Sequence, residues 1–131
     1  MIIWNDSYLL GVEEIDAQHR NLFKHLASIE EQMRVHGTYS CLHVLYFMYS
    51  YAVDHFSLEE SLMDAVAYPE AHRHKAEHEC FRQAALEFHK DVKNPETIGD
   101  VVAYIKQWIV THIADSDRRL CSHILKTRPG L

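Results

Sequence analysis

Two histidines four residues apart, His74 and His78, most constrain what this chain can fold into. On an α-helix, residues at this spacing lie about 40° apart around the axis, so both imidazoles would project from one face and could bind one metal ion. Phe81, Ala85 and Phe88 continue that face at three- and four-residue steps, which predicts that the pair lies on the buried side of an amphipathic helix. A buried imidazole needs a partner for its ring nitrogens, so the rest of the chain must provide one.

The spacing of apolar residues elsewhere predicts three more amphipathic helices, and no segment alternates as a strand would. The predicted start signals are Asp16 for the first helix, Ser40 for the second, Pro69 for the third and Asn94 with Pro95 for the fourth. The first helix would end at Gly37 and the third at about Lys93. We therefore expect an all-α fold, an up-down-up-down antiparallel four-helix bundle, with an irregular N-terminal arm over residues 1–14 and a tail over residues 119–131 that consists of a last helical turn or two followed by loose chain.

Length and composition narrow the class of protein. The 131 residues suit one domain, 1–131, although an ending such as residues 125–131 is compatible with a domain cut from a longer signalling protein. The formal net charge of −6 argues against nucleic acid and anionic membrane partners, and no apolar stretch is long enough for membrane insertion. The start of the chain lacks signal-peptide features, which predicts a cytoplasmic location. Cys41, Cys80 and Cys121 have no CxxC spacing, so neither a disulfide framework nor a cysteine zinc site is indicated.

Each predicted helix carries at least one histidine on its apolar face, and two acids share these faces. The set is His19, His55, Glu59, His74, His78, His112 and Asp117. Five nitrogen donors and two carboxylates are too many for one tetrahedral zinc, but they suit two octahedral ions with both carboxylates bridging and one further bridging oxygen. That arrangement leaves one coordination position open. Imidazole with carboxylate suits iron, manganese or zinc, and the lack of thiolates argues against copper(I) and iron–sulfur clusters.

A purely structural role for these residues is the competing interpretation, since eleven histidines in one chain will produce some pairs by chance. Against it, His55 with Glu59 is the only HxxxE pair, His74 with His78 is the only HxxxH pair, and both lie on core faces. His72 would point about 200° away from His74, off the opposite side of the helix. The histidines that complete no set, and that we predict not to be ligands, are His25, His36, His43, His72, His89 and His123.

These motifs resemble those of the bacterial hemerythrins, from Trp4 to about Leu120. The matching segments are Gly11-Val12 with Ile15-Asp16-Ala17-Gln18-His19, His55-Phe56 with Glu59-Glu60 and Met63, Tyr68-Pro69 with His74-Lys75-Ala76-Glu77-His78, and Trp108 with His112-Ile113 and Asp117. The resemblance implies two iron ions (Fe2+/Fe3+) with an oxo or hydroxo bridge, and reversible binding of O2. By the same resemblance, His74, His78 and His112 would hold one iron, His19 and His55 the other, and Glu59 and Asp117 would bridge them. The iron on the His19/His55 side would be the one that takes up O2.

Apolar residues next to the ligand positions predict a dry pocket over the open position, suited to dioxygen and small anions. The predicted pocket residues are Leu22, Phe56, Phe81, Trp108, Ile109 and Ile113. Ordinary core packing would also account for side chains of this kind.

Four functions are compatible with this sequence. The first is O2 carriage or storage without enzymatic activity, and the second is a sensory domain whose iron redox or O2 state regulates a fused diguanylate cyclase or chemoreceptor. A ferritin-like di-iron oxidase is disfavoured, since those sites use Glu-x-x-His motifs and this chain has none. The fourth is an iron-free structural four-helix domain.

Overall fold

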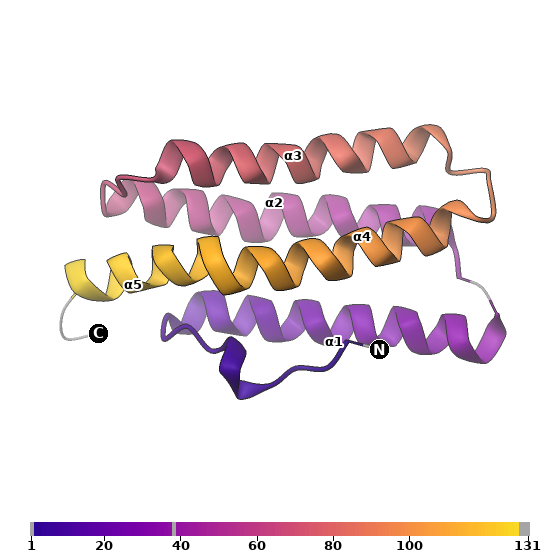
Figure 1. Cartoon of the computed structure of the whole chain (residues 1–131), viewed down its shortest axis with the longest axis horizontal. Coiled ribbons are helices and arrows are strands. Elements are labelled where there is room, and N and C mark those ends of the chain that lie inside the picture. The colour runs from indigo at the N-terminus through magenta and orange to yellow at the C-terminus, as the bar shows by residue number, and fades with distance from the viewer. Residues whose placement is uncertain (1, 38, 129–131) are drawn as a thin grey trace.

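Four long helices lie side by side and alternate in direction, as the sequence predicts (Figure 1). The computed structural model describes residues 2–37 and 39–128. The helices are α1 (Glu13–His36), α2 (Cys41–Ala65), α3 (Ala71–Lys90) and α4 (Thr97–His112), after which a π-helical segment (Ile113–Asp117) leads into α5 (Arg118–Thr127). None of the described residues forms a strand, and no helix among them is both long and apolar enough to span a bilayer. The predicted all-α, up-down-up-down bundle is confirmed.

Each long helix buries one apolar face along the bundle axis. Leu26, Leu45, Phe81 and Ile105, one from each of α1 to α4, are fully buried. Burial of such a side chain contributes about 1.5–3 kcal/mol, so the core residues together dominate the stability of the bundle. The same faces carry the buried polar residues, which places those groups inside the core.

The helix ends are predicted correctly between α1 and α2 and less well elsewhere. Gly37 follows α1 with a left-handed φ of 74°, and the Ser40 hydroxyl accepts a hydrogen bond from the His43 amide at 3.3 Å. The prediction of Asp16 as N-cap was wrong: α1 begins at Glu13, and Asp16 lies in its first turn. Its carboxylate bonds to amides that precede the helix.

The predicted ends of α3 and the start of α4 were also wrong. Pro69 lies in a turn before α3, which begins at Ala71 and ends at Lys90 instead of about Lys93. Asn94 and Pro95 belong to a connecting turn in which the Asn94 side chain accepts the Glu96 amide at 3.0 Å, and α4 begins only at Thr97. In both places, the residues predicted to begin the helix lie instead in the turn that precedes it.

The tail, predicted as a last helical turn or two followed by loose chain, continues the bundle as the ten-residue helix α5, which ends at Thr127 and is therefore longer than predicted. Leu120, Cys121 and Ile124 form a buried face at helical spacing, and this burial stabilises the helix. Arg118 donates to the Ser7 carbonyl at 3.0 Å, which joins α5 to the N-terminal arm. The rest of the predicted tail, residues 129–131, lies outside the described residues.

The N-terminal arm lies alongside α1, apart from one short 3-10 turn (η1, Asp6–Tyr8), much as predicted (Figure 1). Trp4 and Tyr8 both pack on Phe23 of α1, with ring centroids 5.3 and 4.7 Å away. The buried carboxylate of Asp16 accepts the backbone amides of Leu10 and Gly11 at 2.8 and 3.0 Å. These hydrogen bonds therefore attach the arm to the first turn of α1, three residues before the first metal-binding candidate, His19.

Replacing Asp16 with alanine should destabilise the protein, because it leaves two amides of the arm without their acceptor. We expect the free energy of unfolding to fall by about 2–3 kcal/mol in Asp16→Ala, measured by urea denaturation. Asp6→Ala removes an exposed carboxylate from the same arm and should change it by less than about 0.5 kcal/mol. Equal losses in the two variants would contradict the role assigned to Asp16.

Candidate metal centre

The seven residues predicted as metal ligands all lie in the middle of the bundle, and every one is buried. Their side chains come from every long helix: His19 from α1, His55 and Glu59 from α2, His74 and His78 from α3, His112 from α4, and Asp117 from the π-helical segment. They form two groups, and Glu59 and Asp117 belong to both.

The first group gathers three imidazole nitrogens around one oxygen of each carboxylate. Glu59 Oε1 lies 3.2 Å from His74 Nε2 and 3.0 Å from His78 Nε2. Asp117 Oδ1 lies 3.1 Å from His74 Nε2 and 3.0 Å from His112 Nε2. The three histidines also face one another, with His112 Nε2 3.1 and 3.2 Å from the other two nitrogens.

The second group uses the other oxygen of each carboxylate. Glu59 Oε2 lies 2.8 Å from His55 Nε2, and Asp117 Oδ2 lies 3.0 Å from His19 Nε2. The two imidazole nitrogens are 2.9 Å apart. Each carboxylate thus directs one oxygen into each group, which is the placement that a bridging ligand requires.

These separations fit a pair of metal ions better than a hydrogen-bond network. Adjacent ligand atoms of an octahedral ion with bonds of about 2.1 Å are roughly 3 Å apart, as they are here. Glu59 Oε2 and both Asp117 oxygens are buried and form no hydrogen bond with a described residue, in spite of their short distances to histidine nitrogens. Buried carboxylate oxygens without hydrogen bonds are costly unless an ion binds them, so the residues present fit a two-metal centre.

The π-helical segment explains how Asp117 joins the group. His112 and Asp117 are five residues apart, a spacing that would separate them by about 140° on an α-helix. In a π-helix the hydrogen bond runs from residue i to i+5, and the wider turn brings residues at this spacing closer to one face. The sequence carried this signal as a five-residue step, although it was not recognised there as a π-helix.

Polar side chains behind the histidines were missed as functional residues in the sequence. The Nδ1–H of His78 donates to Glu60 at 2.8 Å, and His112 Nδ1 lies 3.1 Å from Glu77, which also accepts a hydrogen bond from Ser116. His55 Nδ1 lies 2.5 Å from the Gln18 amide oxygen. Such contacts hold the proton on Nδ1 and direct the Nε2 lone pair into the cluster. Each of Gln18, Glu60 and Glu77 adjoins a predicted ligand in sequence, and that adjacency was the available signal.

The charges of the cluster shift several pKa values strongly. Burial lowers the pKa of His55, but the carboxylates of Glu59 and Asp117 outweigh it and raise that pKa to about 9. Burial raises the pKa of Asp117, whereas His112 and the other histidines outweigh it and hold that pKa well below its ordinary value. The pKa values of His74 and His112 are raised as well, so without metal these three imidazoles hold protons beside ionised carboxylates, and a metal ion that binds must displace those protons.

Aromatic side chains enclose the cluster on one side. Phe56 stacks on His78 with centroids 3.8 Å apart, and Trp108 stacks on His112 at 4.2 Å. Phe81 contacts both Phe56 and Trp108. The other predicted pocket residues, Leu22, Ile109 and Ile113, are buried. Trp108 itself is only partly buried.

Tyr51 lies within the predicted apolar pocket and was missed as a site residue. Its ring stacks on His55 at 5.0 Å and contacts Phe56, Phe81 and Trp108. Burial, with the nearby carboxylates of Asp117 and Glu59, raises the pKa of Tyr51 well above its ordinary value, so the phenol keeps its proton. The signal in the sequence was its position one helical turn before His55.

None of the six remaining histidines joins either group within the described part of the chain. His25, His36, His43, His72 and His89 are exposed. His123 is half-buried, with its Nε2 3.4 Å from the Val66 carbonyl oxygen. The helical phase that separated His72 from His74 agrees with their exposed and buried positions.

Two buried groups of histidines that share two carboxylates, inside a four-helix bundle, define a candidate two-metal protein. The chain matches the family model for the hemerythrin HHE cation binding domain over residues 10–124, and it belongs to the hemerythrin family. It is similar to the bacteriohemerythrin of Clostridium acetobutylicum, with 28% identity over 125 residues that cover 90% of this chain and 97% of that protein. It is also similar to the hemerythrin-like protein of Naegleria gruberi, with 31% identity over 117 residues that cover 88% of this chain and 87% of the relative.

A pair of variants on one helix should separate ligands from other histidines. His74→Ala should lower metal affinity by more than the roughly 10–100-fold typical of losing an outer hydrogen-bond partner, since it removes a nitrogen from the cluster. His72→Ala, two residues away and exposed, should retain the metal content of the unaltered protein. Iron per chain, measured by atomic emission after iron-replete expression, tests both. Equal iron content in the two variants would contradict the assigned ligand set.

Proposed function

We propose that this chain binds two iron ions at the shared cluster and takes up dioxygen reversibly. The observation that carries the proposal is the unequal division of histidines: three lie on one side of Glu59 and Asp117, and two lie on the other. With both carboxylates and one small oxygen bridge counted for each ion, the three-histidine side would supply six ligands and the two-histidine side five. The proposed open position is therefore beside His19 and His55. The iron pair would supply the reversible exchange of electrons that dioxygen binding requires.

The protein's own residues would hold the ions and keep the site dry. Glu59 and Asp117 would bridge, while Gln18, Glu60 and Glu77 would orient three of the histidines through Nδ1. The buried side chains proposed to limit access of water to the open position are those of Leu22, Phe56, Phe81, Ile109 and Ile113, together with the partly buried Trp108. Such a wall suits a small neutral ligand or a small anion.

The positions of the acidic residues at the site support dioxygen binding without catalysis. Glu59 and Asp117 lie between the two groups, and Glu60 and Glu77 contact histidine Nδ1 atoms. Each of these carboxylates has a use in holding the cluster, so none is left to act as a general acid or base. Storage, delivery and sensing would each use this site in the same way, because each requires only that dioxygen bind and leave.

The test is an anaerobic reduction followed by exposure to air, watched by visible absorption. We expect two irons per chain and a colour that appears with air, disappears when oxygen is removed under vacuum or argon, and returns on re-exposure. One zinc per chain at full occupancy after iron-replete expression would contradict the iron assignment. Irreversible oxidation on the first exposure, with two irons retained, would contradict reversible binding.

A further inference from the structure

The hydroxyl of Tyr51 is a buried polar group without a partner. Tyr51 is 6% exposed, and its hydroxyl oxygen forms no hydrogen bond with any described residue. A buried hydroxyl in this state raises the free energy of the fold, and a phenylalanine would fill the same space without that cost. The unpaired hydroxyl of Tyr51 therefore suggests that a bound ligand forms a hydrogen bond with it.

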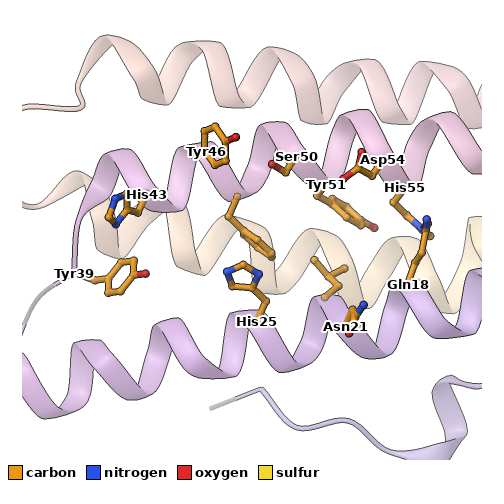
Figure 2. A pocket seen from close by; sticks show the side chains of 12 residues that line it. Gln18, Asn21, His25, Tyr39, His43, Tyr46, Ser50, Tyr51, Asp54 and His55 are labelled. Carbon is orange, nitrogen blue, oxygen red and sulfur yellow. The ribbon is translucent and has the colours of Figure 1, made fainter.

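The Tyr51 ring lies at the two-histidine end of the cluster. It is nearly parallel to the His55 imidazole, with an interplanar angle of 13° and a centroid distance of 5.0 Å. Figure 2 shows the two side chains extending from α2 on the same side, with the hydroxyl end of Tyr51 toward His55. The aromatic neighbours of Tyr51, Phe56 and Phe81, offer no hydrogen-bond acceptor apart from their ring faces.

A groove between α1 and α2 leads to this end of the cluster. Its volume is about 430 Å³, and its lining includes Leu22, Tyr51 and His55. In Figure 2, Gln18, Tyr51 and His55 lie at one end of the groove, and Tyr39 and His43 lie at the other. A small molecule that enters from solvent along this groove reaches Tyr51 and His55 together.

We propose that the Tyr51 hydroxyl donates a hydrogen bond to the small ligand bound on the His19/His55 side, either dioxygen or a small anion such as azide. This inference rests on the function proposed above. Tyr51 then acts as a ligand-orienting residue in an otherwise apolar wall, and its hydroxyl gains in the liganded state the partner that it lacks in the protein alone. The interaction favours ligands that accept a hydrogen bond over apolar molecules of similar size.

The first test compares azide binding to the diferric protein in two tyrosine-to-phenylalanine variants, followed by visible absorption. Tyr51→Phe keeps the ring and removes only the hydroxyl, so its Kd for azide should rise about 3- to 10-fold, the range expected for one net hydrogen bond. Tyr104→Phe is the matched control, because Tyr104 contacts Phe81 and Phe88 but no histidine of the cluster. Its Kd should stay within about twofold of the unaltered protein. An unchanged Kd in Tyr51→Phe, at full iron content, would overturn the inference.

The second test needs no iron. Metal-free Tyr51→Phe should melt at the same temperature as the unaltered metal-free protein or higher, because the missing hydroxyl had no partner. A lower melting temperature would show that the hydroxyl already has a partner within the protein, and this would also overturn the inference. Failure of the unaltered iron-loaded protein to bind both dioxygen and azide would instead overturn the proposed function, and this inference with it. Normal binding in both proteins would overturn only the role of Tyr51.

Discussion

Two buried carboxylates at the centre of the bundle, Glu59 and Asp117, are the constraint on which the rest of the structure depends. Neither is exposed to solvent, no described lysine or arginine pairs with them, and their close neighbours are histidine nitrogens. Two negative charges in such a place raise the free energy of folding unless positive charge accompanies them. Protons on His55, His74 and His112 provide that charge without metal. Two metal ions would provide it with better geometry, since each carboxylate already faces both groups.

The surrounding layers of the fold support this centre in different ways. The arm, through Asp16, holds the first turn of α1 ahead of His19, and the π-helical segment brings Asp117 onto the face of His112. Glu60 and Glu77 face the three-histidine group with negative charge, whereas neutral Gln18 faces the two-histidine group. This difference gives the two sides of the proposed metal pair different electronic surroundings, in addition to their different numbers of histidines.

The features predicted well from the sequence are those that depend on local periodicity. The spacing of His74 and His78, and their phase relative to His72, follow from helical geometry alone, so the structure places the pair inside and His72 outside.

Helix ends were less predictable, because Pro69 and Asn94 favour turns as well as first helical positions. The helix α5 was underestimated since its stability comes from burial of Leu120 and Ile124 against other elements. The contacts of Glu60, Glu77 and Tyr51 depend on how neighbouring helices pack against one another. The apolar periodicity of a single helix carries no information about that packing.

The most direct test of the central claim is the thermal unfolding of the metal-free and iron-loaded proteins at one pH and ionic strength. If Glu59 and Asp117 are held by metal, loading iron should relieve several kcal/mol of burial cost. The iron-loaded form should then melt roughly 10 °C or more above the metal-free form. Equal melting temperatures, with iron content verified in the loaded sample, would show that the buried carboxylates do not depend on metal and would contradict the account.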